Sequence, residues 1–245
     1  MPDFYILLIG FFFIALIYAS VGFGGGSSYL ALLAVMGVGY ETLRPTALLC
    51  NIVVVTGGTF IFYREGKLDF KKAVPFVVAS VPFAFLGGYW KIGESVFFLL
   101  LGLSLVLASV FLWIQPKEAE PSSVNRPWAN AGLGGALGLL SGMVGIGGGI
   151  FLAPLLHLLR WDVAAKISAL AGFFILVNSV GGLAGQWARL GTLDFEFILP
   201  LLGAVLAGGQ VGSRLGARKF TGLYIKRITA VLILLAGINI LRDHL

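Results

Sequence analysis

The chain has 245 residues, of which 58% are hydrophobic and 11% are charged, and its net charge is +6. Soluble domains carry about a quarter charged residues, so this composition excludes an ordinary soluble domain and predicts an integral membrane protein. The basic residues lie between apolar segments, which indicates membrane topology rather than a nucleic-acid-binding surface. The lipid bilayer is therefore the expected partner, and nucleic acid is not.

Ten apolar segments follow one another along the chain. They lie at 4–21, 27–39, 43–63, 73–90, 94–115, 128–143, 149–160, 163–187, 195–212 and 221–241. A helix needs about 20 residues to cross a bilayer, so the second and seventh segments are short for that. A polar stretch divides the ten segments five and five. We therefore predict an N-terminal transmembrane repeat at 1–115, a cytoplasmic linker at 116–127 and a C-terminal repeat at 128–245.

A glycine motif directly precedes each short segment, reading VGFGGG at 21–26 and VGIGGG at 144–149. Glycine allows positive φ, and the first N–H groups of the next helix lack acceptors and carry partial positive charge. Such a turn suits an anion. We therefore predict two broken or re-entrant helical hairpins, at 4–39 and 128–160, whose glycine turns meet from opposite sides. The candidate substrate-binding residues are Gly22, Gly24, Gly25, Gly26, Ser27, Gly145, Gly147, Gly148 and Gly149.

Glycines spaced four residues apart have a different interpretation. Close helix packing is the usual role of glycine in membrane helices. We assign that role, and no binding function, to Gly134, Gly138, Gly142, Gly208 and Gly212.

The two halves repeat one another in inverted orientation. Besides the glycine motif, the tripeptide Leu-Asp-Phe occurs at 68–70 and again at 193–195. Loop 64–72 is strongly basic and its counterpart 188–196 is not, whereas the next pair of loops, 91–94 and 213–227, shows the reverse. With both termini outside, most of the 17 Lys and Arg lie inside, as the positive-inside rule requires. The predicted fold is an all-α integral membrane protein with two inverted five-segment repeats.

Six polar residues complete the candidate site. Asn51 and Asn178 lie deep in apolar segments, where an amide faces either a cavity or another helix. Arg44 and Lys166 lie at matching helix starts, where they could attract an anion or simply extend to the membrane interface. Thr46 and Ser168, two residues further on, are candidates for gating or for helix capping.

Other classes of function find little support in the sequence. No Asp or Glu lies deep in an apolar segment, which disfavours a carboxylate-based cation site and a metal site. We find no Cys/His cluster and no catalytic-triad spacing, so we expect neither an enzyme nor a cofactor. Inverted repeats with broken helices are instead typical of secondary transporters.

These motifs resemble those of the TauE/SafE family of sulfite-exporter-like permeases. The resemblance rests on VGFGGGSSYLALL, VGIGGGIFLAPLL, KISALAGFFILVNS at 166–179 and the paired Leu-Asp-Phe, and it covers essentially the whole chain. It implies transport of sulfite, sulfonates or related small anions across the bacterial inner membrane. We therefore expect a multi-pass transporter that works by alternating access. Two alternatives stay open, an anion channel of the same architecture and a non-transporting membrane scaffold.

Overall fold

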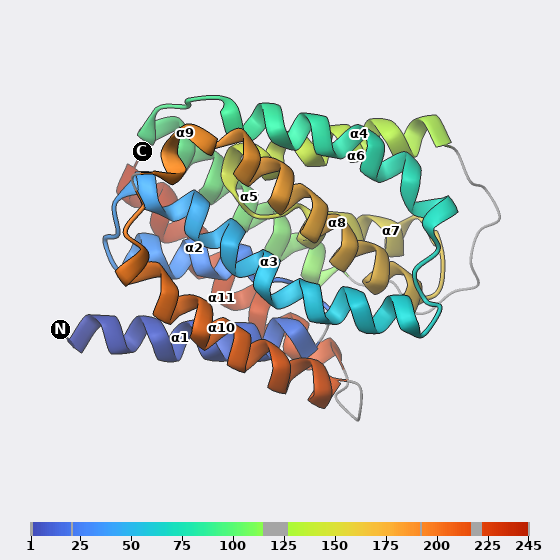
Figure 1. The fold of residues 1–245 in the computed structure, drawn as a ribbon, viewed down its shortest axis with the longest axis horizontal. Helices are drawn as coiled ribbons and strands as arrows, with labels where there is room; N and C mark the ends of the chain where they lie inside the picture. The colour runs from blue at the N-terminus through green and yellow to red at the C-terminus, as the bar shows by residue number, and fades with distance from the viewer. Residues whose placement is uncertain (1, 21, 115–126, 192, 217–221, 245) are drawn as a thin grey trace.

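The computed structural model describes residues 2–20, 22–114, 127–191, 193–216 and 222–244. These residues form eleven helices and no strand, which confirms the all-α prediction (Figure 1). The helices are α1 (Pro2–Ser20), α2 (Gly26–Val35), α3 (Tyr40–Arg64), α4 (Phe70–Tyr89), α5 (Glu94–Trp113), α6 (Pro127–Val144), α7 (Gly149–Leu158), α8 (Ala164–Gly185), α9 (Trp187–Leu190), α10 (Phe195–Gly216) and α11 (Gly222–His244). The sequence did not predict α9. The expected linker at 116–127 lies outside the described residues except for Pro127.

Helices α2 and α7 are too short to cross a bilayer. Each has ten residues, or about 15 Å at 1.5 Å per residue, against a hydrocarbon core of about 30 Å. Five helices of the described residues, α3, α4, α5, α8 and α10, are long and apolar enough to span it. In Figure 1, α2 lies toward the end of the molecule that carries both termini, and α7 lies toward the opposite end.

The two halves of the chain interleave. Helix α1 packs along α10, α6 packs along α4, and α5 packs along α11, so each pair joins a helix from each half. In the α4–α6 pair, Gly134, Gly138 and Gly142 lie directly against the backbone of Phe76, Ser80 and Ala84; in the α1–α10 pair, Gly208 and Gly212 lie against that of Phe12 and Leu16. The packing role predicted for these glycines is confirmed, because a Cβ at any of them would collide with the facing helix.

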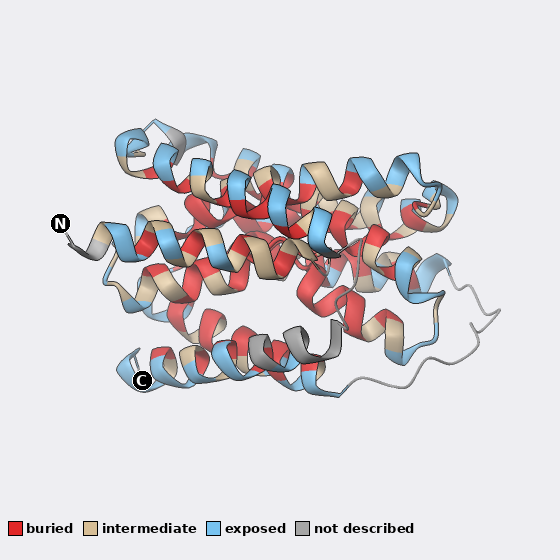
Figure 2. Cartoon of the chain, turned by 90° about the horizontal axis from the view of Figure 1, so that it is seen from below, coloured by how far each residue is buried: buried red, intermediate tan, exposed pale blue. Residues whose placement is uncertain are grey.

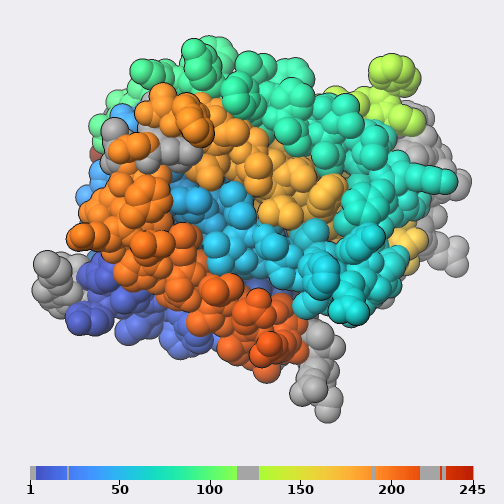
Figure 3. Space-filling view, in the orientation of Figure 1, coloured from blue at the N-terminus to red at the C-terminus, as the bar shows by residue number. Residues whose placement is uncertain are grey.

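Helices α3 and α8 cross in the centre of the bundle. Helix α8 also contacts α4, and α3 also contacts α10, so these four helices lie side by side on the face shown in Figure 3. Buried residues line the inner faces of the helices, and exposed residues follow the outside (Figure 2). Large apolar side chains are among those exposed, for example Val78 at 66%. A surface this apolar fits lipid rather than water.

Both termini lie at one end of the bundle, and the turn from α3 to α4 lies at the other (Figure 1). Lys71 lies at the start of α4, and Gly191 follows α9 near the end that carries the termini. In a chain whose only cysteine, Cys50, is replaced by serine, Lys71→Cys and Gly191→Cys should therefore be labelled from opposite sides. The measurement uses a membrane-impermeant thiol reagent on intact cells and on inverted vesicles. Positive-inside charge predicts that Lys71→Cys reacts from the cytoplasm. Labelling of both positions from the same side would contradict an inverted repeat.

An ion-pair cluster fixes the turn between α7 and α8. Asp162, whose side chain is only 7% exposed, accepts from Lys72 Nζ on α4 at 2.6 Å and lies 3.7 Å from Lys166 Nζ. Burial by itself would raise the pKa of Asp162, but hydrogen bonds from Lys72 and the Val163 N–H, with the two lysine charges, bring that pKa below its usual value. The cluster ties the second hairpin to α4.

Asp162→Asn should lower the melting temperature by about 2–4 °C at pH 7, since the lysine partners are partly exposed and the pair contributes about 1 kcal/mol. Because folding lowers the pKa of Asp162, this stabilisation is present above the ordinary value of about 3.9 and is lost as the pH falls through the lowered one. Melting curves of both proteins from pH 7 to pH 3 should converge in acid. Glu196→Gln, at an exposed carboxylate, is the control. A difference that persists or grows in acid would contradict the assignment.

Candidate functional site

The two glycine turns each place a left-handed glycine at the start of a short helix. Gly25 precedes α2 with φ +88°, and Gly148 precedes α7 with φ +78°; no side chain caps either helix. The first N–H groups of both helices therefore have no acceptor within their own helix. Three further glycines of the turns, Gly22, Gly145 and Gly147, also have positive φ. Only glycine adopts this run of conformations at low cost.

Asn51 lies between the two turns, near the middle of α3. Its Nδ2 donates to the carbonyl of Ile146 in the second turn at 3.2 Å. A Cβ added to Gly24 in the first turn would lie 2.5 Å from its Oδ1, and one added to Gly147 would lie 3.0 Å from its Nδ2. The structure thus brings both turns to the same buried amide, which is fully inaccessible. Asn51 is hydrogen-bonded to the second turn and packs against the first, so the residue contacts both turns as well as lining the space between them.

Ile175 of α8 contacts the second glycine turn in the way that Asn51 of α3 contacts the first. Gly26 packs against Asn51, and its motif counterpart Gly149 packs against Ile175. Likewise Gly145 packs against Arg44, and its counterpart Gly22 packs against Ser168. Arg44 therefore corresponds to Ser168, two residues away from the sequence-based pairing with Lys166. The sequence-based pairing matched a basic residue to a basic residue without knowing which side chains face the turns.

Several buried polar atoms around the turns have no hydrogen-bond partner. Among the described residues these include Tyr29 Oη, Asn51 Oδ1, Ser141 Oγ and Ser179 Oγ. Each belongs to a residue that contacts a turn: Tyr29 beside Gly25, Asn51 beside Gly24, Ser141 beside Gly148 and Ser179 beside Gly147. Buried polar groups are normally satisfied, so several unsatisfied groups in one place indicate a site for a polar ligand or water. Sequence reasoning missed Tyr29, Ser141 and Ser179, because hydroxyl residues are common in membrane helices.

The first turn is also supported by hydroxyl contacts. Tyr18 Oη lies 2.7 Å from Ser28 Oγ and 3.4 Å from Ser27 Oγ, which joins the end of α1 to the start of α2. Ser27 is 1% exposed. Its contact with Tyr18 is long for a hydroxyl pair, so the Ser27 hydroxyl keeps bonding capacity for a ligand at the helix start.

The remaining candidates have other environments. Asn178 is buried and donates to Phe174 O within α8, while its Oδ1 has no partner. Lys166 lies at the surface beside Asp162. Thr46 and Ser168 are not helix caps, so the capping interpretation is wrong for both. Helix α3 begins at Tyr40 and α8 at Ala164, and their N-caps are Gly39 and Val163.

Arg44 is fully buried, contrary to both interpretations that placed it at a membrane interface. Its Nη2 donates to Gly142 O at 2.7 Å and to Gly87 O at 3.0 Å. These carbonyls belong to the last turns of α6 and α4, where carbonyls lack intrahelical partners and the helix dipole favours a cation. The guanidinium therefore joins the ends of two helices from different halves of the chain.

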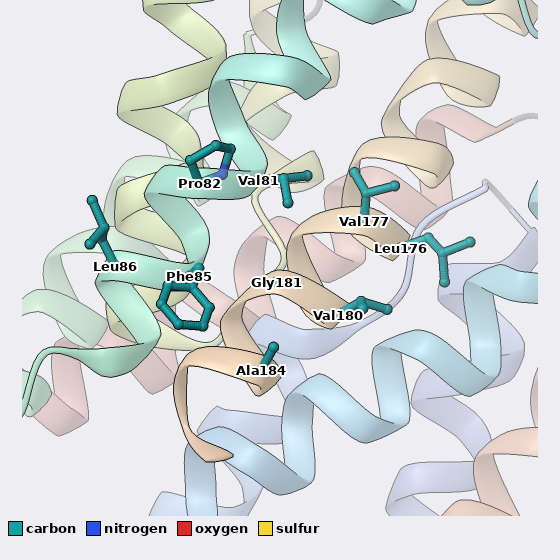
Figure 4. Close-up of a pocket in the computed structure, with 9 residues that line it drawn as sticks. All are labelled: Val81, Pro82, Phe85, Leu86, Leu176, Val177, Val180, Gly181 and Ala184. Carbon is teal, nitrogen blue, oxygen red and sulfur yellow. The ribbon is translucent and has the colours of Figure 1, made fainter. Parts of the chain in front are cut away.

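A wide apolar hollow in the described structure lies apart from this site. It is a groove of about 730 Å³ between α4 and α8, lined by Val81, Pro82, Phe85, Leu86, Leu176, Val177, Val180, Gly181 and Ala184 (Figure 4). None of these side chains can bind an anion. A second hollow, of about 10 Å³, lies against the first turn and is lined by Ala19, Gly22, Phe23, Val54, Val55, Gly58, Thr59, Phe62, Gly172 and Ser213. It has room for about one water molecule.

Comparison with known proteins places this geometry in context. Residues 6–240 match the family described as Sulfite exporter TauE/SafE. The chain is 34% identical over 240 residues to the probable membrane transporter protein y4hK of Sinorhizobium fredii, covering 96% of this chain and 97% of that protein. It is 24% identical to the probable membrane transporter protein YunE of Bacillus subtilis over 245 residues, covering 88% and 89%. No solved structure matches the chain.

Proposed function

This chain belongs to the sulfite exporter TauE/SafE family of membrane transporters, and on that premise we propose that it carries small anions by alternating access. The proposed substrates are sulfite, sulfonates or related sulfur-containing or organic anions. We place the protein in the bacterial inner membrane with its basic loops inside and both termini outside. Its transport would need no metal or cofactor.

The observation that carries the anion proposal is the meeting of two helix starts at one buried place. Helices α2 and α7 begin at Gly26 and Gly149, and the turns before them share Asn51. Each helix start offers free N–H groups and the positive end of a dipole. The unpartnered hydroxyls of Tyr29, Ser141 and Ser179 beside the turns can donate to anionic oxygens. Together they suit a compact oxyanion near the middle of the membrane.

The packing of the helices supports inverted repeats. In an inverted repeat α1, α3, α4 and α5 correspond to α6, α8, α10 and α11, in that order. Under this correspondence the α1–α10 pair becomes the α6–α4 pair, and both pairs are observed. The α3–α8 and α5–α11 pairs each become themselves. The α5–α11 contact is reciprocal: a Cβ on Gly102 would lie 3.2 Å from Gly237 O, and one on Gly237 would lie 3.1 Å from Gly102 O. Such reciprocity is typical of two-fold symmetry. Inverted repeats with a central site are the usual architecture of secondary transporters.

Two measurements test this function. Sulfite, methanesulfonate, acetate and chloride are each added to purified protein, and a bound anion should raise the melting temperature in proportion to its affinity. The anion that binds is then used in counterflow in proteoliposomes. A transporter accelerates exchange of labelled anion, a channel conducts electrogenically, and a scaffold does neither. Failure of all small anions to bind or exchange would overturn the proposal.

A further inference from the structure

The central site is closed unequally toward the two ends of the bundle. The hollow beside Gly22 lies on the side toward the C-terminal ends of α3 and α10, since Thr59, Phe62 and Ser213 line it. Arg64 and Arg214 lie in the last turns of these helices, and Lys67 follows α3 in the next loop. We call this side the basic end, and the side of the two termini the terminal end.

Toward the terminal end the corresponding place is sealed by backbone contacts. In the register of the paired motifs, Ala19 and Ser213 of the hollow correspond to Gly142 and Gly88, and Gly58 corresponds to Gly182. These three glycines pack against one another: a Cβ on Gly142 would lie 2.8 Å from Gly88 N, and one on Gly182 would lie 3.4 Å from Gly142 Cα. We call Gly88, Gly142 and Gly182 the glycine seam. The seam joins α4, α6 and α8 at the terminal end. The corresponding place at the basic end is the small hollow.

Arg44 lies at this seam and bridges two of its helices. Its Nη2 binds Gly142 O on α6 and Gly87 O on α4, while its backbone lies against Gly145 in the second turn. Its counterpart at the basic end is Ser168, which lies against Gly22 and cannot bridge two carbonyls in this way. The two ends therefore differ both in packing and in the presence of a buried cation.

We propose that Arg44 is the latch of a gate at the glycine seam, which keeps the terminal-end route to the anion site closed in this state. The proposal rests on the alternating-access function. Opening that route requires α4 and α6 to separate, which breaks the bonds from Arg44 to Gly87 and Gly142. Arg44 thus acts through helix position and contacts no substrate here. At the basic end a small hollow lies where the seam closes the terminal end, and Ser168 takes the place of Arg44 beside the turn.

Cysteine accessibility tests the latch without any substrate. In the Cys50→Ser background, Gln186→Cys reports the terminal end, because Gln186 follows α8 one turn beyond Gly182 and is 2% exposed. Ser213→Cys reports the basic end. The reactive side of each is calibrated against Gly191→Cys and Lys71→Cys. With Arg44 intact, Gln186→Cys should resist labelling from the terminal end, and Ser213→Cys should react from the basic end.

Arg44→Gln should raise terminal-end labelling of Gln186→Cys by about tenfold, the factor that one charged hydrogen bond corresponds to. Arg44→Lys, which keeps the charge on a shorter side chain in place of the guanidinium Nη2 that donates to both carbonyls, should raise it less. Ser168→Ala, the counterpart change, should leave it unchanged. Elution as a single species from size-exclusion chromatography establishes folding, and if Arg44→Gln does not fold, Arg44→Lys carries the test.

Unchanged labelling of Gln186→Cys in the folded Arg44 variants would overturn the latch. Anion binding to the unmutated protein is measured separately by calorimetry, so a failed latch and a failed transport function give different results. If labelling of Gln186→Cys increases but no anion binds, the gate is supported and the proposed substrates are wrong. If an anion binds but labelling is unchanged, the proposed substrates are supported and the gate is wrong.

Discussion

Replacing Gly25 or Gly148 by alanine should weaken anion binding strongly while leaving the chain inserted in the membrane. Both glycines have φ near +80°, which costs any other residue about 1–3 kcal/mol. The new Cβ would also lie 3.0 Å from Ile14 at position 25, and 2.9 Å from the Phe174 ring at position 148. Either change moves the N–H groups of a helix start away from the shared site. Calorimetric titration of the anion found in the screen should show affinity lowered at least tenfold.

Two other glycines provide matched controls. Gly203→Ala, in α10, places its Cβ where no atom lies within 4 Å and should bind normally. Gly134→Ala places its Cβ against the Phe76 backbone and should lower the melting temperature more than the affinity of folded protein. Unchanged affinity in both Gly25→Ala and Gly148→Ala would mean that the turns serve packing and that the anion binds elsewhere.

Asn51→Leu should lower transport per folded molecule at least tenfold. This loss should be larger than that caused by Asn178→Leu. The change removes the donor to Ile146 O and leaves that carbonyl without its side-chain partner, at a cost of about 1–3 kcal/mol. It also removes the side-chain amide that lies beside both turns. Counterflow, normalised to monodisperse protein, measures the loss.

Asn178→Leu is the matched comparison for Asn51→Leu. Its amide donates only within its own helix, to Phe174 O, so losing that bond separates no two elements. We expect a smaller reduction in transport, with stability changed by less than about 0.6 kcal/mol, the average for hydrogen bonds that join separate membrane helices. Equal effects of the two substitutions would place Asn178 in the site as well. Unchanged transport in Asn51→Leu would remove Asn51 from it.

The short helices could be predicted because their cause is local. A run of glycines interrupts an apolar stretch, and the apolar residues that remain before the next polar break are too few to span a bilayer. Helices α2 and α7 confirm this, each starting at the last glycine of its motif. The packing glycines were predictable for the same reason, since a four-residue spacing puts them on one face of a helix.

The environment of Arg44 could not be predicted in this way. Its carbonyl partners lie 43, 44 and 98 residues away in the chain, and nothing near Arg44 in the sequence indicates them. A basic residue near a helix start ordinarily reaches toward water, so the interface was the natural expectation. Ile175 and Ser179 were missed similarly, because the turns they face come from other parts of the sequence. Side chains that meet through tertiary packing are visible only in the structure.

The interleaving of the two halves has a consequence for how the protein is made. Helix α1 enters the membrane first, but the helix that covers its glycine-spaced contact, α10, is synthesised about 175 residues later. At 5–20 residues per second, α1 waits roughly 10–35 seconds for its partner. During that time its contact face is open to lipid, to the insertion machinery or to another nascent chain. Quality control of this protein should therefore act on chains that stall before α10, and truncations that end in the linker should be degraded rather than accumulate as stable half-proteins.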